Sequence, residues 1–176
     1  MTTSAFNHLR FDAPVPEEAV VAARAFAIKA HGDQVYGDKS YVEGHLDRVE
    51  ALVRFYKLPN FFRVGAYLHD TLEDTAVTQE ELAQSFGVDI GDMVDCVSGF
   101  GETRRERNED IVGKLQHNPQ YVPLKLLDRL ANVEACVEEG KLEFLPMYRK
   151  EMPMYYGLFS AAYPEAYARL CRALNW

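Results

Sequence analysis

The sequence is poor in cysteine, and its cysteines lack the spacing of metal or redox sites. Cys96, Cys136 and Cys171 lie in apolar or helical sequence and form no Cys-x-x-Cys pair. Thiolate zinc sites and redox motifs need such pairs. We therefore expect these three residues to be reduced and buried, in a reducing compartment.

The chain also lacks long apolar runs and an excess of positive charge. No window approaches the roughly 18 apolar residues of a membrane span, and residues 1–8 carry neither a basic stretch nor an apolar leader core. The 27 acidic residues outnumber the 19 basic ones, whereas nucleic-acid surfaces are basic. We expect a cytoplasmic protein that binds neither membrane nor nucleic acid, although an anionic nucleotide would still bind through a metal ion and local basic side chains.

A helical pattern runs through all 176 residues, and no alternating strand pattern competes with it. With 48% hydrophobic residues the chain has enough apolar surface for one core. The expected fold is all-α, a single compact domain of residues 1–176. Helices are expected over residues 17–30, 42–56, 61–72, 79–85, 90–97, 121–139, 142–156 and 165–174.

Two local signals refine this pattern. Thr78-x-x-Glu81 predicts a capping box at a helix start, and Gly87 predicts the stop of that helix. The polar, glycine-containing segment 98–110 is expected to be a surface loop, or alternatively a lid that brings Arg104 or Arg105 over phosphates.

The pair His69-Asp70, followed by Glu73-Asp74, is the main candidate site. On one helix, residues four apart share a face, so an imidazole and three carboxylates would converge. A solvated surface is the usual setting of such acidic clusters. Here the apolar run 61–68 enters the cluster from a buried direction, and buried charges need a partner such as a cation.

His45 and Asp128 would complete a metal site. Asp128 is unexpected because it stands in an apolar helical pattern, residues 124–132. Two imidazoles and two carboxylates suit an octahedral ion such as Mn²⁺, Fe²⁺ or Mg²⁺ better than a closed thiolate zinc site. Such an ion lowers the pKa of bound water and polarises a phosphoryl oxygen. Glu73 and Asp74 would orient that water or move its proton, and Asn132 would hydrogen-bond substrate.

The order His45, His69-Asp70, Asp128 resembles the HD-domain metal phosphohydrolases, whose ligands follow the pattern His, His-Asp, Asp. Within that family the chain is similar, from about Ala19 to Val137, to the hydrolase domain of RelA/SpoT homologues. The segments that carry this resemblance are Ala-His-x-x-Gln (residues 30–34), Tyr41, Leu-His-Asp-Thr-x-Glu-Asp-Thr (68–75), Phe-Gly (86–87) and Lys-Leu-x-Asp-Arg-Leu-x-Asn (125–132).

The resemblance implies an HD-domain helical bundle with the activity of a small alarmone hydrolase. That activity is the manganese-dependent release of pyrophosphate from the 3′ position of (p)ppGpp. His31, at the end of the first expected helix, is either a fifth metal ligand or a supporting group, and we favour a partly buried histidine that hydrogen-bonds and packs near the site.

The chain departs from the family where substrate is chosen. The basic pair that usually follows Gln34 is replaced by Val35-Tyr36, and Lys39 is the nearby base. Tyr36 would stack on the nucleobase in place of arginine. Two alternatives therefore stay open: an HD phosphohydrolase for another nucleotide, such as a dNTP, an adenosine alarmone or NADPH, and a metal-stabilised binding protein without catalysis.

Aromatic residues gather near the C-terminus. We expect them to pack in the core or at an interface of a homo-oligomer rather than to stack on bases. They are the Tyr and Phe residues at positions 144, 148, 155, 156, 159, 163 and 167.

Lys125 and Arg149 are the basic residues that we expect to contact substrate phosphates. Lys125 precedes Asp128 by one turn, and Arg149 lies in the aromatic-rich helix. Substitution of either should raise KM more than it lowers kcat, because a phosphate contact made equally in ground and transition states affects binding alone. Steady-state kinetics on the nucleotide substrate would check this, and a fall in kcat at unchanged KM would contradict the binding role.

Overall fold

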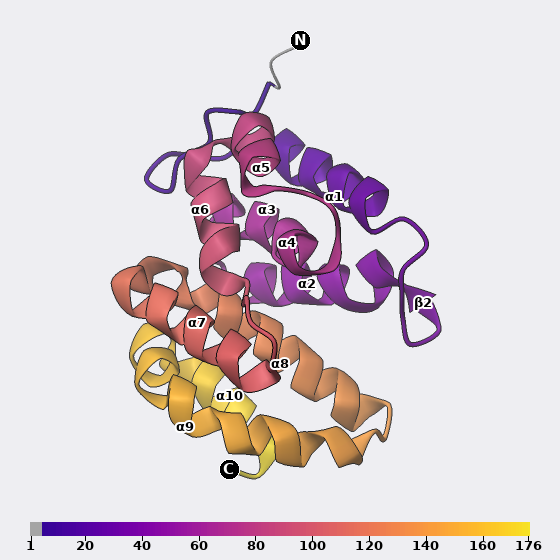
Figure 1. The fold of residues 1–176 in the computed structure, drawn as a ribbon, viewed down its shortest axis with the longest axis vertical. Coiled ribbons are helices and arrows are strands. Elements are labelled where there is room, and N and C mark those ends of the chain that lie inside the picture. Colours follow the sequence, from indigo (N-terminus) through magenta and orange to yellow (C-terminus); the bar gives the residue numbers. More distant parts are fainter. Residues whose placement is uncertain (1–4) are drawn as a thin grey trace. The chain divides into compact units, whose positions relative to one another are not determined.

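The computed structural model describes residues 5–176, so the first four residues, part of the segment in which no leader is predicted, lie outside it. The chain divides into two compact units, one ending at Ser98 and one spanning Gly99–Trp176. Each unit is built from helices (Figure 1), which confirms the all-α prediction. The single domain expected from chain length stays a prediction. Over residues 5–176, none of the helices combines the length and the apolar character that crossing a membrane requires.

The central helix of the first unit is α3, Asn60–Leu68. It packs against α1 (Glu17–His31), α2 (Asp47–Phe55) and α6 (Val88–Val97); Figure 1 shows it among them. Seven of its nine residues are buried. Because each large apolar side chain contributes about 1.5–3 kcal/mol when buried, tertiary packing rather than intrinsic propensity fixes this helix.

The predicted capping signals in the first unit are confirmed. The Thr78 hydroxyl accepts from the Glu81 N–H at 3.2 Å, and the Glu81 carboxylate accepts from the Thr78 N–H at 2.8 Å. This reciprocal pair begins α5, Gln79–Phe86. Gly87 ends that helix with φ at 102°, a conformation that glycine adopts without steric cost.

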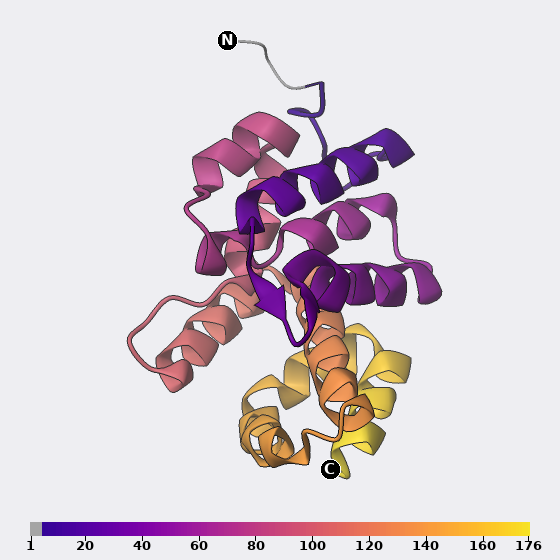
Figure 2. The ribbon, with the colours of Figure 1, turned by 90° about the vertical axis from the view of Figure 1, so that its right-hand side faces the viewer.

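The segment before α2 is less regular than expected. The predicted helix 42–56 begins as a π-helix, Val42–Leu46, and only then continues as α2. A short antiparallel hairpin, β1 (Val35–Tyr36) and β2 (Lys39–Ser40), packs against the π-helix (Figure 2). The sequence pattern predicted no strand, and for residues 35–40 that prediction is wrong. Gly44 permits the contact, because a Cβ atom would lie 2.8 Å from the Tyr36 carbonyl oxygen.

In the second unit the long helix α8 packs against α9 and α10, and α7 packs against α9. The prediction of a loop over residues 98–110 is wrong for the second half of that segment. Thr103 and Glu106 form a capping box there, which begins α7 at Arg104. The elements of this unit are α7 (Arg104–His117), a 3₁₀ turn (Pro119–Tyr121), α8 (Val122–Glu138), a 3₁₀ turn (Leu142–Phe144), α9 (Leu145–Ala162) and α10 (Pro164–Leu174).

Two of the three cysteines are buried, as predicted. Cys96 in the first unit and Cys136 in the second are buried, and Cys171 is partly buried; all three are free thiols. The C-terminal aromatics divide: Tyr155 and Phe159 are fully buried in the second unit and stack on each other, whereas Tyr156 is 54% exposed.

A buried ion cluster holds α7, α8 and α9 together. Glu151 accepts from Arg129 and from Arg104, each at 2.5 Å, and both Glu151 and Arg129 are less than a tenth exposed. Asn108 accepts from Arg129 at 3.1 Å and from the Tyr155 hydroxyl at 2.7 Å. Burial alone would raise the pKa of Glu151, but hydrogen bonds and charges from both arginines outweigh it and lower that pKa.

Replacing Glu151 by Gln should destabilise the protein by about 3 kcal/mol at neutral pH, because it leaves the buried Arg129 without its counter-charge. The folded-state pKa of Glu151 is lowered. As the pH falls through that pKa, Glu151 becomes protonated and neutral like the glutamine of the variant, so the difference in stability between wild type and variant should shrink. Urea unfolding from pH 7 to pH 3 would measure this. Arg105→Ala, at an exposed pair with Glu109, serves as the control and should leave the free energy of unfolding nearly unchanged; an equal loss for both variants would contradict the role of the buried cluster.

Candidate metal centre

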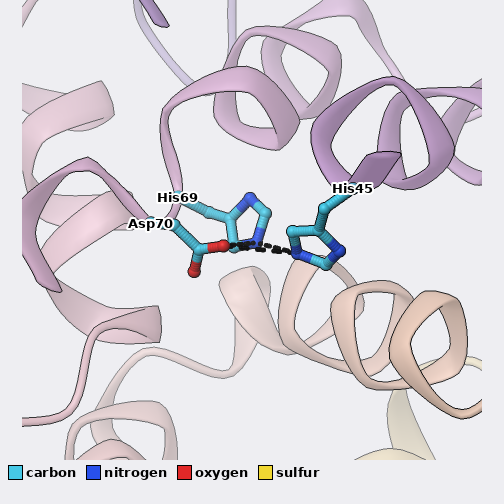
Figure 3. Close-up of side chains that lie close together, drawn as sticks. All are labelled: His45, His69 and Asp70. Atoms are coloured by element: carbon cyan, nitrogen blue, oxygen red, sulfur yellow. Dashed lines mark hydrogen bonds and ion pairs between the residues drawn. The ribbon is translucent and has the colours of Figure 1, made fainter. Parts of the chain in front are cut away.

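Three side chains of the first unit point toward one another (Figure 3). His45 comes from the π-helix, and His69 and Asp70 come from the turn between α3 and α4, Thr71–Asp74. The two imidazole Nε2 atoms lie 3.2 Å apart, and Asp70 Oδ2 lies 3.2 Å from His45 and 3.1 Å from His69. The histidine side chains are 2% and 1% exposed and the Asp70 side chain 14%. The chain therefore directs two nitrogens and one oxygen into a single small volume.

The helix does not continue through His69 and Asp70, so the expected single helix over 61–72 is wrong. It ends at Leu68, whose carbonyl accepts from the Thr71 hydroxyl at 2.7 Å. Asp70 then adopts φ −96° and ψ −2°, between helix and turn. This break turns the Asp70 carboxylate toward both imidazoles.

The sequence also predicted that all three carboxylates converge with His69, and that prediction is wrong for two of them. Among the described residues, the group whose ligand atoms lie within 4.8 Å of one another contains His45, His69 and Asp70. Glu73 and Asp74, on the short helix α4, remain exposed to solvent. They flank the centre instead of forming it.

The hydrogen bonding of His69 fixes what its other nitrogen can do. Its Nδ1 lies 2.9 Å from the Ala66 carbonyl oxygen, which only accepts, so Nδ1 must carry the proton. In neutral His69 the Nε2 lone pair then faces the Asp70 carboxylate and the Nε2 of His45. Acceptors about 3 Å apart repel each other unless a proton or a metal cation lies between them. This donor set fits a divalent ion that takes mixed nitrogen and oxygen ligands.

The electrostatics of Asp70 and Asp74 differ. Burial would raise the pKa of Asp70, but the positive charges that His69 and His45 carry when protonated, together with their hydrogen bonds, hold that pKa well below its usual range. Asp74, although largely exposed, has its pKa raised by partial burial and then by the negative charge of Asp70. Asp70 is therefore held as a ligand anion, and Asp74 is the carboxylate better disposed to take up a proton.

Asp128 lies in the second unit, on α8, and is 6% exposed. Its carboxylate accepts from Lys125 Nζ at 2.9 Å and from Asn132 Nδ2 at 2.7 Å. These contacts satisfy a charge that the apolar pattern around it left unexplained. Its place as a fourth metal ligand, and the contacts of Asn132 and Lys125 with substrate, stay predictions from the sequence.

The other residues predicted to bind substrate have partners within their own units. The Tyr36 ring stacks on the His45 imidazole at 5.2 Å. Lys39 is exposed on β2 and stands opposite Tyr36 in the hairpin register. Arg149 donates from Nε to the Leu174 carbonyl at the end of α10. Their roles toward substrate remain predictions, and Arg104, considered for a lid, pairs with Glu151.

Sequence reasoning did not assign a role to Tyr41 or Gln34, although both stand in the segments that carry the family resemblance. The Tyr41 hydroxyl donates to Asp70 at 2.7 Å and contacts Asp74 at 3.0 Å. Gln34 binds His31, which is 3% exposed and lies outside the metal-binding group. This placement favours the supporting role of His31 over that of a fifth ligand. A cavity of about 290 Å³ is lined by Gln34, Val35, Tyr41 and Asp74.

Comparison with known proteins found relatives that are named as a pyrophosphohydrolase or as GTP pyrophosphokinases. No protein-family model matches the chain. A guanosine-3′,5′-bis(diphosphate) 3′-pyrophosphohydrolase of Aquifex aeolicus is 29% identical over 126 residues, which are 69% of this chain and 18% of the relative. A probable GTP pyrophosphokinase of Mycobacterium leprae is 33% identical over 93 residues, 47% of this chain and 10% of the relative. The chain thus spans about a fifth or less of the length of these curated relatives.

A solved structure extends the likeness to nearly the whole chain. It is that of a metazoan SpoT ortholog that hydrolyses ppGpp, with a TM-score of 0.63, 19% identity and coverage of 93% of this chain and 95% of that one. At this identity the match establishes the fold. Together with the sequence relatives, it confirms the predicted resemblance to the hydrolase domain of RelA/SpoT homologues and its HD-type helical fold.

Saturating Mn²⁺ should stabilise the protein, because an ion that relieves the repulsion at His45, His69 and Asp70 binds the folded state alone. At 100 times the dissociation constant the gain would be about 2.7 kcal/mol, and chelator should remove it. Thermal unfolding with and without Mn²⁺ would measure the gain. His45→Ala should abolish it, and His117→Ala, at an exposed position on α7, should retain it; a gain that survives His45→Ala would contradict this site.

Proposed function

We propose that this chain is a metal-dependent pyrophosphohydrolase and that its substrate is the guanosine alarmone (p)ppGpp. The observation that carries the proposal is the buried meeting of His45, His69 and Asp70, whose lone pairs and charge call for a cation. The substrate is supported by the relatives, one named as a ppGpp 3′-pyrophosphohydrolase and one as a ppGpp-hydrolysing SpoT ortholog. The expected site of action is the cytoplasm.

Mn²⁺ is the proposed ion, with Fe²⁺ and Mg²⁺ as alternatives that take similar ligands. His45, His69 and Asp70 would hold it, and Asp128 is the fourth ligand predicted from sequence. When bound, such an ion lowers the pKa of water and neutralises charge on phosphoryl oxygens. Imidazole and carboxylate ligands would leave coordination positions for the water and for a phosphoryl oxygen.

The chain's own residues supply the proton handling. Asp74 lies beside Asp70 with a raised pKa and lines the cavity with Gln34 and Tyr41. It would accept a proton from the attacking water, with Glu73 in the neighbouring position on α4. In the net reaction, ppGpp and water give GDP and pyrophosphate, and pppGpp gives GTP and pyrophosphate.

A second candidate function has its own observation. The family's basic pair after Gln34 is absent, and the Tyr36 ring that stands in its place is stacked on His45. The nucleobase would therefore meet a different surface from that in the family. An HD phosphohydrolase for a dNTP, an adenosine alarmone or NADPH is the alternative.

Pyrophosphate release from ppGpp should be rapid in Mn²⁺ and absent in chelator. Asp70→Asn should lower the rate by at least about 100-fold, because it removes the anionic ligand. Glu80→Gln, an exposed carboxylate on α5, should leave the rate unchanged. The assay is run on a panel of ppGpp, pppGpp, the adenosine analogue, dNTPs and NADPH.

The panel separates the alternatives. Release from another nucleotide alone would favour the second candidate function. Mn²⁺ binding without turnover of any member would favour the metal-stabilised binding protein and contradict the proposed hydrolase.

A further inference from the structure

One phenol bridges the two carboxylates on which the proposed reaction depends. The Tyr41 hydroxyl lies 2.7 Å from Asp70 Oδ2 and 3.0 Å from Asp74 Oδ2. The same Asp70 oxygen faces both imidazoles. Ionised carboxylates only accept hydrogen bonds, and a phenol has a single O–H. The Tyr41 proton therefore lies mainly toward the nearer Asp70 oxygen and is shared with Asp74, so the hydroxyl links the two carboxylates.

The Tyr41 ring is fixed by its neighbours. It stacks on His31, with ring centroids 4.5 Å apart and planes 12° from parallel, and meets the edges of Tyr36 and His45 at 6.1 Å and 5.7 Å. The Tyr41 N–H donates to the Gln34 carbonyl at 2.9 Å. Ring and backbone together leave the hydroxyl little freedom to move.

A second set of contacts reaches Asp74 from its backbone side. The Gln34 side-chain amide donates to the Asp74 carbonyl oxygen at 2.6 Å, and its Oε1 lies 2.8 Å from His31 Nδ1. Since His31 also stacks on Tyr41, the four residues form a closed loop from the end of α1 to α4. Asp74 is thus held at both its carboxylate and its main chain.

We infer that Tyr41 is a positioning residue, which fixes the Asp70 carboxylate toward the metal and holds one oxygen of the Asp74 carboxylate beside it. The inference deepens the proposed function and rests on it. Through their contacts, His31 and Gln34 hold the Tyr41 ring and the Asp74 main chain in fixed positions relative to each other.

Tyr41→Phe is the decisive variant, because it keeps the stacked ring and removes only the hydroxyl. We expect kcat for ppGpp at saturating Mn²⁺ to fall roughly 10- to 100-fold, as for other groups that orient metal ligands, with KM changed less than about 2-fold. Tyr156→Phe, an exposed tyrosine of the second unit, serves as the matched control and should behave as wild type.

Coupling to Asp74 separates positioning from general loss of structure. In an Asp74→Asn background, Tyr41→Phe should lower kcat by much less than it does alone, since part of its effect passes through that carboxylate. Fully multiplicative losses would overturn the inference. So would a Tyr41→Phe enzyme with wild-type kcat at saturating Mn²⁺.

Calorimetric titration with Mn²⁺ gives a readout besides activity. Tyr41→Phe should weaken Mn²⁺ binding by about 10-fold, because the Asp70 carboxylate loses its orienting donor. If wild type hydrolyses no ppGpp, the proposed function fails, and this titration alone decides the inference. Weaker binding in the variant would then support it, and equal binding would overturn it.

Discussion

The constraint on which the first unit depends is the placement of three electron-rich atoms in one buried volume. The Nε2 atoms of His45 and His69 and an oxygen of Asp70 lie 3.1–3.2 Å from one another. Such an arrangement is unfavourable without a shared cation, so the surrounding structure must hold the groups in place before a cation binds. Packing of α3 contributes to that support, since seven of the nine residues of this helix are buried.

Both segments that carry the ligands depart from regular α-helix. His45 stands in a π-helix, and His69 and Asp70 stand where α3 ends and a turn begins. In a regular α-helix each successive side chain is rotated about the helix axis by a fixed angle. Uninterrupted helices would therefore have pointed these side chains in other directions. Irregular backbone of this kind is common at functional sites and persists because neighbouring packing over-determines it. The close contact of Gly44 with Tyr36 is one example of such packing beside the π-helix.

The second unit follows the same principle of satisfied buried charge. Arg129 and Glu151 are buried together, with Arg104 and Asn108 completing their hydrogen bonds. Asp128 is buried beside Lys125 and Asn132. In each case a polar residue that interrupts an apolar helical pattern is explained by a partner on the same or a neighbouring helix.

The sequence by itself determined the helical class, the capping box at Thr78 and the helix end at Gly87, because these depend on contacts within a few residues. It also marked His45, His69 and Asp70 through their spacing. Only the tertiary structure decided that the helix breaks at His69, that Glu73 and Asp74 stay outside the metal group, and that Tyr41 links Asp70 to Asp74. Those outcomes follow from packing between segments about 30 residues apart, where many weak contacts outweigh local preference.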